Sequence, residues 1–234
     1  QTVTNGAIFP TFQAIQAGRV HSCAIDLSQH AWCWGYNGEG ELGRTAFGPG
    51  QSSDVADTVD FTVTVKHIAT GGLHTCAIST TGAGLCWGYN VAGQLGDGST
   101  TTTGVPQAVV GGLTFRTDPA VIFPSPSPDF PLPPGPFIAA GHDHTCAIAT
   151  DAETYCWGLN QDGQLGDNTR TNRTTPTPVS GAQTFVAITA GLEHTCGLIA
   201  SGAAFCWGEN THGQLGDGTT DDRVVPASVS GDIA

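Results

Sequence analysis

Four histidines each stand two residues before a cysteine, a spacing that could supply half of a metal site. Metal binding needs a thiolate, however, and each of these cysteines has a second cysteine ten positions later with which it could form a disulfide. A catalytic centre also needs one differentiated set of groups, whereas this arrangement occurs in four equivalent copies. We therefore predict no metal site, and we expect internal hydrogen bonds that fix the fold at His21, His74, His144 and His194.

The eight cysteines are predicted to form four disulfides, each between residues ten positions apart. In an antiparallel hairpin, opposing Cys76 and Cys86 also pairs Ala77 with Leu85 and centres the turn on Thr81. Opposed residues of a non-hydrogen-bonded pair have Cα atoms about 4.5 Å apart, which a disulfide can span. No Cys-x-x-Cys spacing occurs, so we expect structural cross-links and not redox centres. The predicted pairs are Cys23–Cys33, Cys76–Cys86, Cys146–Cys156 and Cys196–Cys206.

Four tryptophans could stack on carbohydrate rings, but each belongs to a repeated Trp-Gly-x-Asn segment. A large flat side chain at such a recurring position is expected to pack one repeat unit on the next. We therefore expect structural roles for Trp34, Trp87, Trp157 and Trp207, and for Asn37, Asn90, Asn160 and Asn210.

Motifs for catalysis or cofactor binding are missing from the sequence. It contains no Gly-x-Ser-x-Gly, no His-Glu-x-x-His and no P-loop. Asp97–Gly98–Ser99 and its two later counterparts could present oxygens to calcium, but this is also a common turn formula. Arg44 replaces the aspartate in the first copy, which weakens a shared calcium role. The sequence predicts a protein that is not an enzyme and has no cofactor.

The composition excludes several classes of partner and favours short strands. Seven Lys and Arg against 20 Asp and Glu give a net charge of −13, which argues against nucleic acid and anionic membrane surfaces. The 33 glycines and 14 prolines favour many strands joined by tight turns. No apolar run is long enough for a membrane-spanning helix. With no methionine even at position 1, and with paired cysteines, we expect a processed, secreted or cell-surface chain.

An internal repeat of about fifty residues predicts the fold. Residues 15–43, 68–96, 138–166 and 188–216 align, and their first cysteines are 53, 70 and 50 residues apart. A Gly-rich unit of this length with a Trp-Gly pair is typical of a propeller blade. In the fourth unit we expect strands at 184–188, 194–199, 204–208 and near 225–229. The prediction is an all-β, propeller-like array of four blades, each a four-stranded antiparallel sheet, forming one domain over 1–234. The blades are expected at about 7–60, 61–111, 137–181 and 182–231, with a Pro-rich insertion at 112–136 between the second and the third.

The motif within each unit resembles that of a known family. The second unit carries Trp87–Gly88–Tyr89–Asn90 and then Gly93–Gln94–Leu95–Gly96, after a Gly-x-His-Thr segment. The pattern recurs at 157–166 and 207–216, and the first copy departs from it with Glu41 in place of glutamine. Over nearly the whole chain this resembles the regulator of chromosome condensation repeat. The resemblance implies a β-propeller of four-stranded blades, most often seven.

Four units are compatible with three arrangements: a closed four-bladed ring, an open arc, or a part of a longer polypeptide. Residues 2–6 align with the fourth-strand segment 178–181, and so do residues 227–231, so both ends offer the same kind of strand. The surplus strand would be an unpaired edge or would pair with a neighbouring subunit. Head-to-tail donation of this kind generates rings or filaments.

The insertion holds eight prolines between positions 112 and 136, which favours a stiff, extended arm. Apolar side chains interleave with the prolines, and we expect the arm to pack on its own propeller or to contact a partner. The candidate contact residues are Phe115, Phe123, Phe130, Leu132 and Phe137. Candidate glycosylation sites, with a plain solvated loop as the alternative, are Asn172 in an Asn-x-Thr pattern and Thr101, Thr102, Ser125 and Ser127 for O-linked sugars.

Three classes of function are compatible with a propeller of this kind. The favoured class is a secreted, non-catalytic structural or protein-interaction module, a subunit of an extracellular assembly or filament held by strand exchange and the Pro-rich arm. The alternative is a monomeric binding or enzyme-inhibitory propeller that recognises a protein or a carbohydrate. The role that the resemblance implies in the nucleus, nucleotide exchange on a small GTPase with chromatin binding, is disfavoured by the acidic charge and the paired cysteines.

Overall fold

The computed structural model describes residues 2–4, 7–44, 50–118 and 136–231, and within them the chain is all-β. Four sheets follow one another along the chain, each with four antiparallel strands in sequential order. We number these sheets as blades 1 to 4. Blade 1 holds β3 (Phe12–Ala17), β4 (His21–Asp26), β5 (Ala31–Gly35) and β6 (Ser53–Thr58); blade 2 holds β7 (Val65–Thr70), β8 (His74–Ser79), β9 (Gly84–Gly88) and β10 (Thr103–Ala108); blade 3 holds β11 (Ile138–Ala140), β12 (His144–Ile148), β13 (Thr154–Gly158) and β14 (Arg173–Pro178); blade 4 holds β15 (Phe185–Ala190), β16 (His194–Ile199), β17 (Ala204–Gly208) and β18 (Arg223–Ser228).

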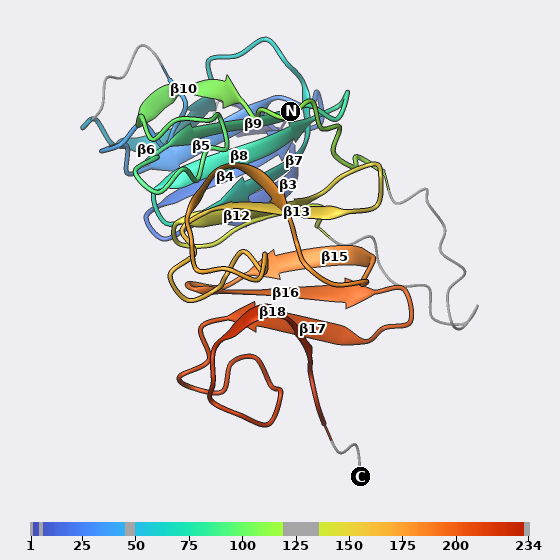
Figure 1. Ribbon diagram of the computed structural model, residues 1–234. Coiled ribbons are helices and arrows are strands. Elements are labelled where there is room, and N and C mark those ends of the chain that lie inside the picture. The colour runs from blue at the N-terminus through green and yellow to red at the C-terminus, as the bar shows by residue number, and fades with distance from the viewer. Residues whose placement is uncertain (1, 5–6, 45–49, 119–135, 232–234) are drawn as a thin grey trace.

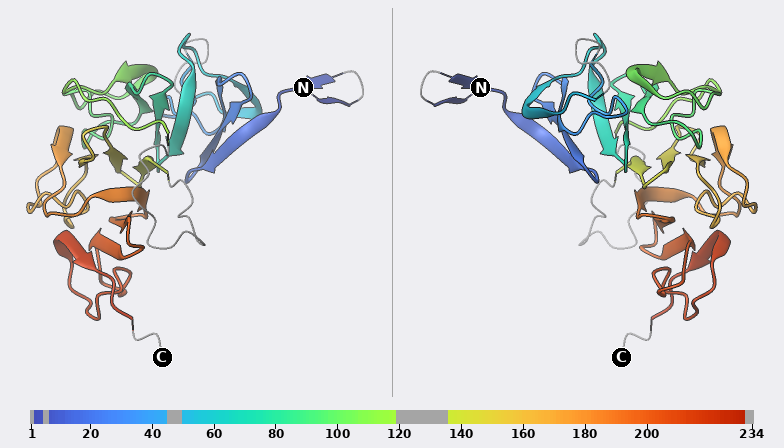
Figure 2. Two further views of the ribbon diagram at one scale, coloured as in Figure 1. Left: turned by 90° about the vertical axis from the view of Figure 1, so that its right-hand side faces the viewer. Right: turned by 90° about the vertical axis from the view of Figure 1, so that its left-hand side faces the viewer.

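The four blades stand side by side in an open arc (Figures 1 and 2). Strand β4 contacts β7, β8 contacts β11, and β12 contacts β15, so each blade packs on the next. Blades 1 and 4 lie at opposite ends of the arc (Figure 2). The predicted array of four blades is therefore confirmed, and the described residues form an open arc and not a closed ring of four blades.

The central hairpin of each blade has the predicted register and the predicted disulfide. In blade 2, Cys76 pairs with Cys86 and Ala77 with Leu85. The four disulfides join the expected cysteines with Cα–Cα distances of 4.1 Å. Each disulfide cross-links the two middle strands of its sheet, and in blades 1 to 3 its cysteines are 0% exposed.

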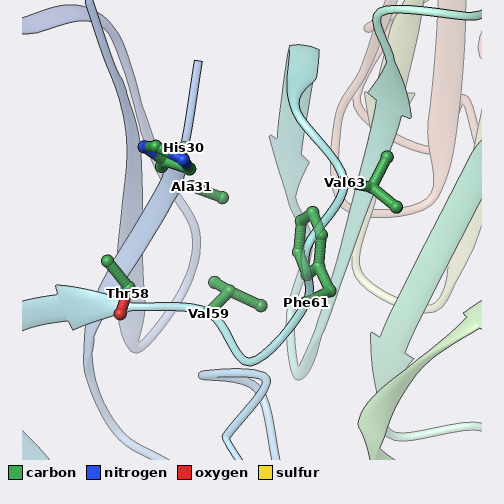
Figure 3. Close-up of a pocket in the computed structure, with 6 residues that line it drawn as sticks. All are labelled: His30, Ala31, Thr58, Val59, Phe61 and Val63. Atoms are coloured by element: carbon green, nitrogen blue, oxygen red, sulfur yellow. The ribbon is translucent and has the colours of Figure 1, made fainter. Parts of the chain in front are cut away.

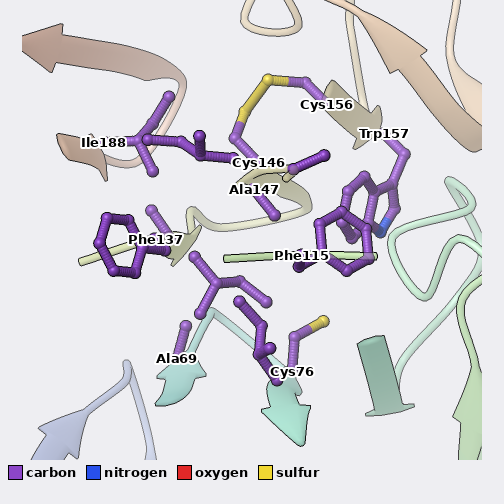
Figure 4. Close-up of a cluster of buried hydrophobic side chains, with 14 of the residues drawn as sticks. Ala69, Cys76, Phe115, Phe137, Cys146, Ala147, Cys156, Trp157 and Ile188 are labelled. Atoms are coloured by element: carbon purple, nitrogen blue, oxygen red, sulfur yellow. A yellow bond between two sulfur atoms is a disulfide. The ribbon is translucent and has the colours of Figure 1, made fainter. Parts of the chain in front are cut away.

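The core lies mainly between blades. Leu95 of blade 2 and Trp157 of blade 3 are fully buried in one cluster that also holds the Cys146–Cys156 disulfide (Figure 4). A glycine is required beside the tryptophan: Gly96 has φ +66°, and a Cβ there would lie 2.8 Å from Trp157 Nε1. The Gln-Leu-Gly segment of one blade thus packs against the tryptophan of the next blade.

The described parts of the N-terminus and of the insertion differ from the expectations. Strand β1 (Thr2–Thr4) pairs with β2 (Ala7–Phe9) in a separate two-stranded hairpin. Residues 119–135 of the insertion lie outside the described residues. Phe115 pairs with Ala149 and is 2% exposed, as is Phe137, and both belong to the buried core (Figure 4). These two phenylalanines are therefore core residues at blade 3, in line with the expectation that the insertion packs on its own propeller, and they are not available for contact with a partner.

The described residues include no helix long and apolar enough to cross a membrane.

Candidate functional site

Each pair of neighbouring blades is joined by a buried chain of hydrogen bonds. Between blades 2 and 3, Thr145 Oγ1 donates to the carbonyl oxygen of Gln94 at 3.1 Å. His74 Nε2 lies 2.9 Å from the same Oγ1, and it must be the donor because the hydroxyl hydrogen is already used. Trp157 Nε1 donates to the same Gln94 carbonyl at 2.9 Å. The equivalent chains are His21–Thr75–Glu41 with Trp87, and His144–Thr195–Gln164 with Trp207.

The three bridging histidines are held neutral by burial. Burial lowers the pKa of His21 to about 4 and the pKa of both His74 and His144 to about 3. Desolvation penalises the imidazolium form, and among the described residues no carboxylate raises the pKa of these three histidines. Within the described residues, no group of three or more His, Cys, Asp or Glu side chains is placed to hold a metal ion. The histidines therefore act as hydrogen-bond donors between blades.

The repeated asparagines tie each blade's long loop to its sheet. Asn90 Oδ1 accepts a bond from the backbone N–H of Leu95 at 3.0 Å. Its amide group donates to Asp97 Oδ1 at 3.2 Å and to the carbonyl oxygen of Thr101 at 3.1 Å. The same bonds are made by Asn160 and Asn210, and Asn37 Oδ1 accepts from the N–H of Leu42.

The aspartates considered for calcium take part in these same loops. Asp217 Oδ1 accepts from the backbone N–H of Thr219 at 3.0 Å, and its Oδ2 accepts from Arg223 Nε at 2.6 Å. Hydrogen bonds from the Thr219 hydroxyl and from Arg223 lower the pKa of Asp217 to about 2. In blade 1, Arg44 takes the aspartate position and donates to the carbonyl oxygen of Cys33 and to Asp57. The loops of blades 1 and 4 therefore each pair a carboxylate with an arginine of the same blade.

The tryptophans of three repeats are closed to a ligand. Trp87, Trp157 and Trp207 have 0% exposure, so their faces cannot stack on a sugar ring. Trp34 of blade 1 is partly exposed, and it stacks on Phe12 with ring centroids 6.3 Å apart. The difference arises because no described blade precedes blade 1.

Two of the candidate modification sites, Asn172 and Thr102, hold equivalent positions in the loops of blades 3 and 2. Asn172 is exposed, and its Oδ1 accepts a bond from the backbone N–H of Asn160 at 2.9 Å. Thr102 holds the equivalent place in blade 2, where its hydroxyl accepts from the N–H of Asn90. Thr101 is adjacent to Thr102 on the same loop and is exposed. Ser125 and Ser127, with the arm residues Phe123, Phe130 and Leu132, lie outside the described residues.

A small hollow of about 210 Å³ lies between blade 1 and the chain that leads into blade 2. Its lining includes His30, Thr58 and Phe61 (Figure 3). His30 Nδ1 lies 3.5 Å from Asp26, but His30 is the one ionisable residue in the lining. The lining of this hollow therefore offers no pair of ionisable side chains for general acid–base catalysis.

Comparison with known proteins identifies the repeat. One sequence model of the regulator of chromosome condensation (RCC1) repeat matches residues 12–41, 65–94, 137–164 and 185–214. A second matches residues 151–198 and 201–233. The chain belongs to the RCC1 repeat family. All four matches of the first model fall on the first three strands of a blade and the loop that follows them.

Known relatives share part of their length with this RCC1-repeat chain. The ultraviolet-B receptor UVR8 of Arabidopsis thaliana is 30% identical over 172 residues, 71% of this chain and 34% of that protein. The human probable E3 ubiquitin-protein ligase HERC4 is 28% identical over 165 residues, 70% of this chain and 14% of its own length. The chain thus spans 34% and 14% of the length of these two relatives.

Solved structures show the same fold at low identity. Yeast RCC1 (Prp20), crystallised bound to Kap60, superposes with a TM-score of 0.76 at 20% identity over 99% of this chain and 50% of that chain. Human WBSCR16 superposes with a TM-score of 0.62 at 20% identity over 93% of this chain and 67% of that chain. The four blades therefore correspond to about half of the yeast propeller.

Proposed function

We propose that this chain is a non-catalytic protein-interaction propeller that works outside the cell or at its surface. The observation that carries the proposal is that most of the repeated polar side chains are buried and hydrogen-bonded inside the fold. His74, Asn90 and Trp157 are each fully buried and bonded, so the groups that could do chemistry instead hold blades and loops together. What remains for function is the outer surface.

The disulfides support a location in an oxidising compartment. All eight cysteines are paired, one bond in each blade, and free cysteines are absent from the described residues. Disulfides persist in secreted and cell-surface proteins and are rare where glutathione keeps thiols reduced. Titrating thiols in the denatured protein tests this step: we expect none, and free thiols would contradict an extracellular role.

Protein partners are favoured over other ligands. The net charge of −13 suits basic protein surfaces and opposes nucleic acid. Among proteins with the same fold, yeast RCC1 was solved bound to Kap60, and a second structure is titled for the binding of Prp20p to Gsp1p and histones. Those likenesses support the kind of partner and not its identity. The buried tryptophans argue against a carbohydrate ligand on the repeat positions.

Two further parts of the chain are proposed contact elements in an extracellular assembly. One is the N-terminal hairpin of β1 and β2, which projects beyond blade 1 (Figure 2). The other is the Pro-rich arm with Phe123, Phe130 and Leu132. Deleting residues 1–9, or replacing 119–135 with a Gly/Ser linker of equal length, should lower the mass measured by light scattering. A monomer in every case would favour the alternative, a monomeric binding or inhibitory propeller.

The experiment for the function as a whole is recovery of the protein from its native source after surface cross-linking. We expect the chain in the extracellular or cell-surface fraction, fully oxidised and cross-linked to protein. Recovery inside the cell with free thiols, or a hydrolytic activity that survives purification, would refute the proposal.

A further inference from the structure

Two loops lie side by side at the same end of every blade, one between its first two strands and one after its third strand. In blade 2, Tyr89 N–H donates to the carbonyl oxygen of Leu73 at 2.8 Å and so joins these loops. In blade 3, Leu159 N–H donates in the same way to the carbonyl oxygen of Asp143 at 2.8 Å. We call the surface that these loops form along the arc the loop face.

The loop face changes from apolar to acidic between blade 2 and blade 4. In blade 2 it presents Leu73 and Tyr89, and both are partly exposed. In blade 3 the position of Leu73 is held by Asp143. In blade 4 the two positions are held by Glu193 and Glu209. Such a surface is complementary to a partner that combines apolar and basic side chains.

A glutamine side chain connects neighbouring blades on this face at two boundaries. Between blades 2 and 3, Gln94 Nε2 donates to Asp143 Oδ1 at 3.0 Å. Between blades 3 and 4, Gln164 Nε2 donates to Glu193 Oε2 at 2.6 Å. The other amide atom stays within its own loop, since Gln94 Oε1 accepts from the N–H of Ala92 at 2.9 Å. At both boundaries an amide donor therefore meets a carboxylate acceptor of the next blade.

The boundary between blades 1 and 2 has a carboxylate in place of this amide. Glu41 Oε2 accepts from the N–H of Glu39 at 2.9 Å, so Glu41 Oε1 holds the place of the donating Nε2. This oxygen is aimed at Leu73, which holds the place of Asp143. Glu41 is 0% exposed, and among the described residues its Oε1 has no hydrogen-bond partner. Burial, together with the nearby charge of Glu39, raises the pKa of Glu41, as expected for a buried carboxylate that lacks a cation.

We propose that the loop face at this boundary binds a lysine or arginine side chain of a basic protein partner. The partly exposed Leu73 side chain turns aside, the cation donates to Glu41 Oε1, and the apolar stem of the bound side chain packs on Leu73 and Tyr89. The acidic side chains of blades 3 and 4 attract further basic residues of the same partner. A second copy of this chain is a poor occupant, because each copy has a net charge of −13. The inference rests on the proposed interaction function and deepens it by naming a surface and the chemistry of the partner.

Supplying the cation from the chain itself tests the role of the carboxylate. Leu73→Lys places an ammonium group at the position that Glu41 Oε1 faces, so its melting temperature should exceed that of Leu73→Met by about 3 °C or more. The difference should vanish in a Glu41→Gln background, which carries the residue that blades 2 and 3 have at this position. Equal melting temperatures of the two Leu73 variants in the presence of Glu41 would overturn the inference.

Photo-cross-linking from the loop face tests the partner. A benzophenone-bearing amino acid replaces Val91, which is 60% exposed on the loop of blade 2. In a matched control protein it replaces Leu27, which is 65% exposed in the turn between β4 and β5 at the opposite end of blade 1. Both proteins are irradiated in their native source, and the cross-linked peptides are identified by mass spectrometry.

We expect capture of a protein from position 91, through a peptide that contains lysine or arginine. Capture should fall by about tenfold in the Leu73→Lys and Glu41→Gln backgrounds, the loss expected for one charge-assisted hydrogen bond, and Leu73→Met should retain most of it. Capture from position 27 alone, a captured peptide without a basic residue, or capture that Leu73→Lys leaves unchanged would overturn the inference and leave the proposed interaction function intact. No capture from either position would contradict both.

Discussion

Thr145→Val isolates the hydrogen-bond chain between blades 2 and 3. Valine has nearly the shape of threonine, so the change removes a hydroxyl without opening a cavity. The Gln94 carbonyl keeps its bond from Trp157 Nε1, but His74 Nε2 loses its acceptor within a side chain that is 0% exposed. A lost hydrogen bond of about 1 kcal/mol and an unsatisfied buried donor of about 1–3 kcal/mol give an expected destabilisation of about 2–4 kcal/mol.

The chain contains its own control for this substitution. Ser22 occupies the same position in blade 1, where no described blade precedes it, so Ser22→Ala should change stability by about 0.5 kcal/mol or less. Both variants are compared with wild type by urea unfolding at pH 7.5, at a concentration low enough to keep the chain monomeric. The free energies come from the midpoints, with the slope checked for constancy.

A double-mutant cycle completes the test. In a His74→Leu background the donor is gone, so Thr145→Val should then cost about 1 kcal/mol or less. Equal effects of Thr145→Val and Ser22→Ala, or an unchanged effect in the His74→Leu background, would show that the bond across the blade boundary does not stabilise the fold.

Three further predictions concern pH, backbone packing and the disulfides. Burial lowers the pKa of His21, His74 and His144 below their unfolded values, so the free energy of unfolding should be level above about pH 6.5. Towards pH 4 it should fall by up to about 1.4 kcal/mol per pH unit for each histidine. Urea midpoints measured across this range test the prediction, and a flat profile would contradict burial of the neutral form. Gly141→Ala places a Cβ 2.7 Å from the Gly191 carbonyl and against His144, so the melting temperature should drop well below that of Gly231→Ala, where no atom lies within 4 Å; similar melting temperatures would disprove the close approach. Replacing Cys146 and Cys156 together with alanine should cost about 3 kcal/mol by the chain-entropy estimate for a ten-residue loop, and an unchanged urea midpoint would refute this role for the cross-link.

The sequence predicted the blades because their signals are local. Ten residues between paired cysteines set the register of each central hairpin, and the structure pairs Ala77 with Leu85 as expected. The strands of blade 4 also lie within one or two residues of the expected ranges, since glycines and polar turn residues bound them.

Sequence reasoning missed the partners of the repeated histidines. Their spacing indicated internal hydrogen bonds, but the acceptor of His74 is Thr145, 71 residues further on in the next blade. The available signal was a hydroxyl residue directly after each His, which is Thr in three copies and Ser22 in the first. It acquires meaning only once the blades are stacked. The same holds for Phe115, which sequence placed on an arm and which stacking places against Trp157 in the core, with ring centroids 6.0 Å apart.

By itself the sequence determined the unit: a four-stranded sheet cross-linked across its middle strands, repeated four times, in an acidic chain without a catalytic motif. Those properties follow from residue spacing within some fifty positions. Only the tertiary structure decided that the units stand side by side in an arc, with each blade packed on the next. The reason is physical: Trp157 is buried because the Gln-Leu-Gly segment of blade 2 lies against it, and no local pattern records which blades become neighbours.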